Sequence, residues 1–273
     1  MGMYIRSNQA SLNVLRNLTS VGFDLNKSLE RLASGYKINR ASDGAASLAI
    51  SEGLRSQIRG SQAAQTNIQQ GISMLQTADG ASQGIYESLQ RIRELAVAAG
   101  NSGADFSALS AEFTQRVTEI NQIANGTEYN DQVLLNGSLG ATINLQVGPN
   151  AGDTINIASA FGNAQASTLG IALTAIGSIG DSATLIGQVD TAMGNLNSIT
   201  AVIGSKTNQL ESQSSNLSIA IENYSAAESS IRNTDIATET ANMTRLQILQ
   251  QSGVLALSQA NMQSSLLLQL LNR

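Results

Sequence analysis

Long heptad seams are the feature that most constrains the fold of this chain. Four stretches carry apolar residues at alternating spacings of three and four, the pattern of helices that pair along a shared seam. They run over residues 15–32, 54–96, 189–231 and 236–267. The third stretch is the most regular and predicts a helix of roughly 65 Å, at about 1.5 Å per residue. Its seam positions are Val189, Met193, Leu196, Ile203, Leu210, Leu217, Ile221, Tyr224 and Ile231.

The centre of the chain follows a different pattern. Residues 107–125 predict a shorter helix, and from residue 128 to 157 the apolar period falls to two. The sequence GPNAGD separates two alternating runs and is typical of a turn, and Asn136-Gly137 is another turn signal, so β-hairpins are expected in this region. Residues 158–187 are rich in Ala, Gly, Ser and Thr without a clear period, and are expected to form a short exposed segment or a short helix. The fold class is therefore mainly α, with long antiparallel helices in a coiled coil or bundle and a small β-hairpin region.

The symmetric order of these stretches predicts a chain that runs out and returns. We expect residues 1–43 and 233–273 to pair as an inner hairpin of terminal helices. Residues 44–157 and 188–232 are expected to form a coiled-coil core domain that carries the hairpin. Between them, Ser42 and Asp43 precede a helical pattern, which favours an N-cap at a specific joint between helices.

Composition argues against several classes of function. The chain has no Cys and no His, so a Ser–His or Cys–His catalytic system is impossible and a zinc site would need carboxylates alone. We expect no enzymatic activity, no catalytic residue, no metal and no cofactor. The net charge is −5 and the basic residues are scattered, which gives no reason to expect nucleic acid as a partner. No run reaches the ~18 apolar residues of a membrane span, and the first fifteen residues lack the apolar core of a signal peptide.

The chain ends in LLLQLLNR, and five of these eight residues are leucine. On a helix they point in nearly every direction, so a single domain cannot bury all of them against itself. Burying five leucines contributes roughly 8–15 kcal/mol, at about 1.5–3 kcal/mol each. Association costs an estimated 4–15 kcal/mol, so this end alone could roughly offset the cost of docking one subunit on another. The leucines are Leu266, Leu267, Leu268, Leu270 and Leu271.

Several long motifs in the same order resemble bacterial flagellins. They are SLERLASGYKINRASDGAASLAIS (28–51), NIQQGISMLQTADGA (67–81), LQRIRELAV (89–97) and RLQILQQSG (245–253). The resemblance covers roughly residues 1–157 and 190–273 and implies a minimal flagellin with a short middle. It further implies a helical homopolymer that forms the extracellular flagellar filament for motility. The implied partners are the flagellar type III export apparatus, an export chaperone, and the cap and hook-associated proteins, without a cleaved signal peptide.

The resemblance and the leucine-rich end together predict a polymerisation interface. Residues Arg91, Leu95 and Glu112 match positions through which many flagellins contact the animal Toll-like flagellin receptor, although packing between subunits would explain them equally well. A hook–filament junction protein of the same superfamily is the alternative function, and LQRIRELAV together with the short middle favours a flagellin. The predicted interface residues are Leu12, Leu15, Leu18, Leu25, Leu257, Leu266, Leu267, Leu268, Leu270 and Leu271.

Overall fold

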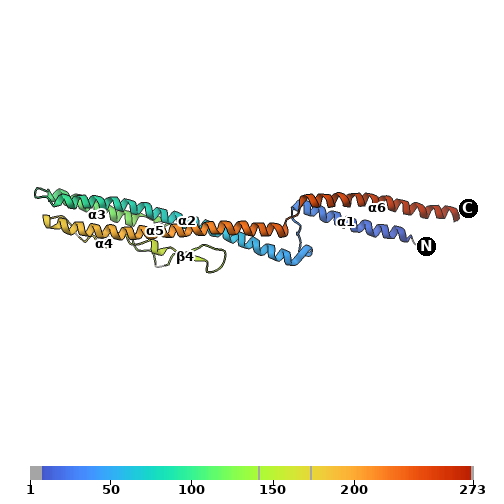
Figure 1. The fold of residues 1–273 in the computed structure, drawn as a ribbon, viewed down its shortest axis with the longest axis horizontal. Coiled ribbons are helices and arrows are strands. Elements are labelled where there is room, and N and C mark those ends of the chain that lie inside the picture. Colours follow the sequence, from blue (N-terminus) through green and yellow to red (C-terminus); the bar gives the residue numbers. More distant parts are fainter. Residues whose placement is uncertain (1–7, 141, 173, 272–273) are drawn as a thin grey trace. The chain divides into compact units, whose positions relative to one another are not determined.

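The computed structural model describes residues 8–140, 142–172 and 174–271, with the backbone alone for residues 264–271. Long helices dominate the structure, which confirms the mainly α prediction (Figure 1). The helices are α1 (Gln9–Ser34), α2 (Ala41–Ala99), α3 (Phe106–Gly126), α4 (Ala166–Leu169), α5 (Ile179–Arg232) and α6 (Ile236–Leu271), with a 3-10 turn at Ala158–Ala160. The strands are β1 (Glu128–Tyr129), β2 (Gln132–Val133), β3 (Asn144–Gln146) and β4 (Thr154–Asn156).

The chain divides into two compact units. Unit 1 joins Met1–Arg55 with Tyr224–Arg273, and unit 2 is the continuous stretch Ser56–Asn223. The long helices α2 and α5 each contribute residues to both units. The finer division expected from the sequence, with a boundary near residues 43 and 233, stays a prediction.

The core of unit 2 lies along the predicted seams. Helices α2 and α5 run antiparallel, because Ser182 Oγ donates to the carbonyl of Ala96 at 2.7 Å while Gln65 Nε2 donates to Ser218 Oγ at 3.1 Å. Helix α3 lies beside α2 (Figure 1) and buries Phe113 and Ile120. Both long seams are confirmed over most of their length, and their buried members are Ala64, Ile68, Leu75, Ala78, Ile85, Leu89, Ile92, Ala96, Val189, Leu196, Ile203, Leu210 and Leu217.

The predicted β-hairpin is present and lies against α2. Strands β3 and β4 pair antiparallel, with Leu145 opposite Ile155. A Cβ placed on Gly60 would lie 2.8 Å from Pro149 Cβ, so glycine is what lets the hairpin turn approach the helix this closely. Asn67 Nδ2 also donates to the carbonyl of Gln146 at 3.2 Å. The hairpin is therefore held by close packing at its turn and by a polar contact at β3.

A second hairpin, β1–β2, lies within the predicted β-hairpin region, but its turn comes earlier in the chain than the expected turn at Asn136-Gly137. Strands β1 and β2 pair with Tyr129 opposite Gln132, which leaves only Asn130 and Asp131 for the turn. These two residues have φ values of 50° and 62°. Asn and Asp tolerate the left-handed conformation better than other non-glycine residues, so a tight two-residue turn forms without glycine.

Of the two expectations for residues 158–187, the structure corrects the exposed segment and shows a short helix, α4. Phe161, Leu169 and Ile176 are buried against the core of unit 2. Asn195 Nδ2 of α5 donates to the carbonyl of Leu169 at 2.8 Å, which ties the short helix α4 to the long one. Small residues between these apolar anchors let an irregular backbone pack closely, so a missing periodicity does not indicate an exposed segment.

Unit 1 is built on the antiparallel pair of α1 and α6, which lie side by side in Figure 1. At one end, Asn8 Nδ2 donates to the carbonyl of Ala260 at 3.0 Å. Along the pair, a Cβ on Gly253 would lie 3.1 Å from Leu18 Cδ1, so the helices approach closely there. At the other end, Ser28 is buried and its hydroxyl lies 3.5 Å from the carbonyl of Glu239.

Candidate functional site

The largest group of exposed apolar side chains lies on unit 1. Fourteen large apolar side chains are exposed among the described residues, and eleven of them belong to unit 1. Two packed helices cannot cover every side of each other, so apolar residues on their outer sides remain in contact with water. They include Leu15, Leu29, Ile236 and Leu249, which lie within the predicted seams. We call these eleven residues the assembly surface: Leu12, Leu15, Phe23, Leu29, Ile50, Ile236, Ile248, Leu249, Val254, Leu255 and Met262.

Five predicted interface residues, four on α1 and Leu257 on α6, differ in how far the subunit itself buries them. Leu12 and Leu15 are 55% and 48% exposed, and both belong to the assembly surface. Leu18 and Leu257 are half-buried. Leu25 is 9% exposed and packs inside unit 1, so its place in an interface between subunits is corrected.

The remaining predicted interface residues, Leu266, Leu267, Leu268, Leu270 and Leu271, lie outside the described side chains. The backbone of α6 continues as a helix to Leu271. Their role in an interface between subunits therefore stays a prediction.

The most exposed members of the assembly surface were missed from the sequence. Phe23 is 71% exposed and Leu255 is 72% exposed. Neither residue occupies a heptad seam position, so the seam pattern does not single them out as interface residues. An exposed aromatic residue outside the seam is the signal that would have identified Phe23, since large apolar groups seldom lie in water without a partner.

A shallow groove of about 280 Å³ runs between α1 and α6. Gly253 opens it, because this position carries no side chain where the two helices meet. The groove adds concave apolar surface to the exposed side chains around it. It is lined by Val14, Asn17, Leu18, Val21, Leu249, Ser252, Gly253 and Ala256.

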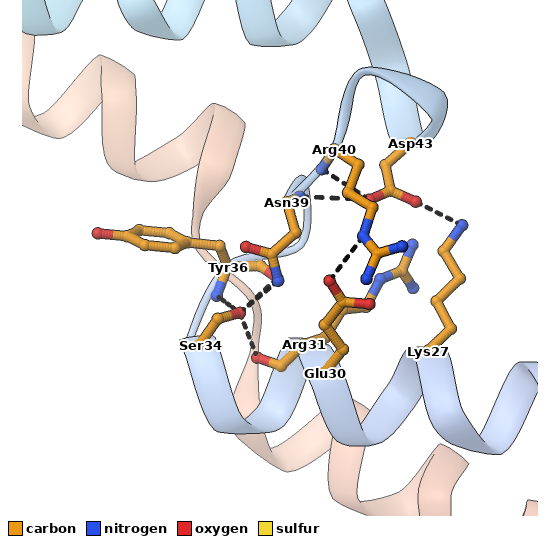
Figure 2. Close-up of polar contacts among 8 residues, drawn as sticks. All are labelled: Lys27, Glu30, Arg31, Ser34, Tyr36, Asn39, Arg40 and Asp43. Atoms are coloured by element: carbon orange, nitrogen blue, oxygen red, sulfur yellow. Dashed lines mark hydrogen bonds and ion pairs between the residues drawn. The ribbon is translucent and has the colours of Figure 1, made fainter.

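The segment between α1 and α2 forms a polar joint, shown in Figure 2. Asp43 Oδ1 lies 2.6 Å from Lys27 Nζ of α1. Asp43 Oδ2 accepts the backbone N–H groups of Asn39 and Arg40 at 3.3 and 3.1 Å. The expected N-cap is thus corrected, because Asp43 binds the backbone that precedes it rather than the first turn of α2. The Lys27 hydrogen bond, helped by the two N–H groups, lowers the pKa of Asp43 to about 2.

The chain returning from α5 closes the joint on its other side. The N–H of Lys37 donates to the carbonyl of Arg232 at 2.7 Å, and the N–H of Thr234 donates to the carbonyl of Gly35 at 2.9 Å. The Arg232 guanidinium lies 4.6 Å from the centre of the Tyr36 ring and donates to Glu52 Oε1 at 2.6 Å. This hydrogen bond lowers the pKa of Glu52, with a second contribution from Arg55. The two connecting segments therefore form one hydrogen-bonded structure.

Of the three predicted receptor residues, the structure brings two together on the surface of unit 2. Arg91 Nε donates to Glu112 Oε1 at 2.7 Å and Arg91 Nη2 donates to Glu112 Oε2 at 3.1 Å, and Glu94 binds the same guanidinium at 2.7 Å. The Arg91 hydrogen bond lowers the pKa of Glu112. Leu95 is only 3% exposed and belongs to the core, so its proposed role as a surface contact is corrected. Its position on the inner face of α2 explains its burial.

Metal-ligand groups and membrane-spanning helices are both absent from the part of the chain that the structure describes. Within that part, no three acidic side chains gather closely enough to hold a metal ion. No described helix combines the length and apolar character that crossing a membrane requires.

Comparison with known proteins identifies related chains along the whole sequence. Residues 5–139 match the bacterial flagellin N-terminal helical region, and residues 186–271 match the bacterial flagellin C-terminal helical region. A flagellin of Halalkalibacterium halodurans is 40% identical over 98% of this chain and 100% of its own length. A flagellin of Bacillus subtilis is 38% identical over the same shares of the two chains.

Solved structures give the same result. The crystal structure of Bacillus cereus flagellin superimposes with a TM-score of 0.51 at 30% identity, over 56% of this chain and 88% of that one. A putative flagellar hook-associated protein from Vibrio parahaemolyticus gives a TM-score of 0.56 over 70% of this chain and 100% of its own, but at 16% identity it shows a shared fold alone. The two matched helical regions and the full-length relatives together place the chain in the bacterial flagellin family.

Proposed function

We propose that the assembly surface of unit 1 is the interface through which this chain polymerises. The chain is a structural subunit of the bacterial flagellar filament, an extracellular appendage, as its membership of the flagellin family implies. The observation that carries the proposal is the uneven distribution of exposed apolar side chains, with eleven on unit 1 and three on unit 2. A monomer leaves that surface in water, and further copies of the chain would cover it.

The free energy available from this surface is large enough for assembly. The eleven side chains are between 43% and 72% exposed, so covering them recovers about half of a full burial each. At about 1.5–3 kcal/mol per full burial, this amounts to roughly 8–16 kcal/mol. The estimated cost of association is about 4–15 kcal/mol, so the surface roughly offsets it before the final leucines are included.

The distribution of charge supports the same arrangement. Unit 2 carries five basic and thirteen acidic residues, whereas unit 1 carries ten basic and seven acidic residues. A strongly acidic surface repels its own copies and keeps them hydrated. Unit 2 is therefore suited to face water in the filament, and unit 1 is suited to close packing.

The interface proposal can be tested with paired charge substitutions. Phe23→Asp together with Leu255→Asp should leave the monomer folded, since both side chains are already in water, and should abolish polymerisation by burying unpaired charges. Val97→Asp is the matched control on unit 2, where the side chain is 60% exposed. Sedimentation and electron microscopy under polymerising salt would measure the outcome. Normal filaments from the double variant would reject the proposed interface.

The proposed partners follow from family membership. Besides itself, the chain would bind the flagellar type III export apparatus, an export chaperone, and the cap and hook-associated proteins, and would leave the cell without a cleaved signal peptide. The second candidate function, a hook–filament junction protein, rests on a likeness of fold at 16% identity. Electron microscopy of the purified chain separates the two functions, because only a filament subunit forms long filaments alone.

The animal Toll-like flagellin receptor is a further proposed partner. The paired side chains of Arg91 and Glu112 would offer a polar contact, now without Leu95. Arg91→Ala should weaken receptor activation by the monomer, since arginine is a frequent interface anchor. Arg93→Ala is a control on the same helix, because Arg93 forms an ion pair with Asp190 of α5 rather than with Glu112. Full activity of the Arg91 variant would exclude the pair as a receptor contact.

A further inference from the structure

Three charged side chains lie on one face near the C-terminal end of α1. Lys27, Glu30 and Arg31 are spaced by three and four residues, so they share one side of the helix. Each of them reaches a residue outside α1. Lys27 Nζ lies 2.6 Å from Asp43 Oδ1, Glu30 Oε1 lies 3.0 Å from Arg40 Nε, and Arg31 Nη1 lies 3.8 Å from Oε2 of a buried glutamate on α6, Glu239.

The signs of these charges alternate along the helix. Lys27 is positive, Glu30 is negative and Arg31 is positive. Their partners Asp43, Arg40 and Glu239, in the same order, each carry the opposite charge. Moving the connecting segment by one helical turn would place Arg40 against Lys27 or Asp43 against Glu30. Like charges at such distances are unfavourable, so the alternation disfavours the neighbouring positions as well as stabilising the observed one.

We propose that the pairs Lys27–Asp43 and Glu30–Arg40 form a charge-coded clasp, which selects one position of the segment 35–43 on α1 and opens when Asp43 loses its charge or its cation. The third pair, Arg31–Glu239, holds the same part of α1 against α6. The clasp has a backbone component, because Asp43 also accepts the N–H groups of Asn39 and Arg40. It depends only on the fold of unit 1 and needs no assembly of the filament.

The environment of Asp43 makes it the central member of the clasp. Its side chain is 10% exposed, whereas those of Glu30 and Arg40 are 39% and 72% exposed. The charged side chain in contact with it is Lys27 of α1, and Arg40, whose backbone N–H it accepts, pairs in turn with Glu30. The low pKa of Asp43 is consistent with a carboxylate stabilised by these contacts. The exposed Glu30–Arg40 pair contributes less to stability and more to the choice of position.

Hydrogen exchange of the full-length chain at neutral pH tests the clasp directly. The amides of Asn39 and Arg40 should be protected, and Asp43→Asn should speed their exchange about tenfold or more, because hydrogen bonds to a charged acceptor are the stronger ones. Lys27→Met should have an effect of the same sign, since it keeps the aliphatic stem and removes the cation. Arg116→Gln, which breaks an ion pair within α3, is the control and should leave these amides unchanged. Unprotected amides in the unsubstituted chain, or equal protection in Asp43→Asn, would overturn the proposal.

A second set of variants tests the charge code itself. Arg40→Glu places an acidic group beside Glu30, whereas Arg40→Gln only removes the attraction. The first variant should therefore lose more protection at segment 35–43 than the second. Adding Glu30→Gln to Arg40→Glu should restore part of the loss, because the repulsion is then relieved. If the two Arg40 variants exchange at the same rate, the alternation of sign does not select the position and the charge code is wrong.

Discussion

The contact between Gly60 and the hairpin turn predicts that two similar glycine-to-alanine substitutions on α2 differ in their effect on stability. A Cβ at Gly60 would lie 2.8 Å from Pro149 Cβ and 3.3 Å from Pro149 Cα, and a rigid proline in a tight turn cannot move aside at low cost. Overpacking of this kind costs about 1–3 kcal/mol. Alanine also stabilises a helix by about 1 kcal/mol relative to glycine. Gly60→Ala should therefore be close to neutral or destabilising by up to ~2 kcal/mol.

The matched control is Gly80→Ala on the same helix. Nothing lies within 4 Å of a Cβ at Gly80, so this variant should gain up to ~1 kcal/mol. Urea unfolding of the two variants as monomers, followed by circular dichroism, measures both effects. The midpoint should rise for Gly80→Ala and stay level or fall for Gly60→Ala. An equal rise of the unfolding midpoint in both variants would refute the close packing of the hairpin turn against α2.

Three further predictions concern the seam, the joint and the leucine-rich end. Leu217→Ala should lower the free energy of unfolding of the monomer by ~2–5 kcal/mol, because it removes a buried seam side chain. The control Ile219→Ala, at an exposed position, should change that free energy little, and equal effects would count against the seam. Because the pKa of Asp43 is lower in the folded state than in the unfolded state, its stabilisation is present above about pH 4 and is lost as the pH falls towards about 2. Asp43→Asn should flatten this part of the stability–pH curve, and an unchanged curve would contradict the assignment. A chain truncated after Ser265 should keep the unfolding transition of unit 2 and fail to sediment as filaments; normal filaments would show that the final leucines are dispensable.

The long helices were predictable because their signal is local and repeated. The seam from Val189 to Leu217 fixes both the existence of α5 and its buried face, since only one helical face can carry that period. The β3–β4 hairpin was also predictable from alternation around a turn. These features depend on residues close together in the sequence.

The features that were missed depend on contacts between residues that are far apart in the sequence, which hydrophobic periodicity does not reveal. The role of Asp43 could not be derived, because its partner Lys27 reaches it only once α1 and the connecting segment have folded against each other. The burial of Phe161 and Leu169 depends on neighbouring helices rather than on periodicity. Leu25 was assigned to the wrong interface for a related reason: a seam residue contacts a helix, and its sequence does not say whether that helix belongs to the same subunit.

A helical reconstruction of the filament by electron cryomicroscopy tests the central claim most directly. It would show what covers the assembly surface, residue by residue. The account predicts that Leu12, Phe23 and Leu255, which are 55%, 71% and 72% exposed in the single chain, are covered by neighbouring copies. A filament in which these side chains remain in water, with unit 2 providing the apolar contacts between subunits, would contradict it.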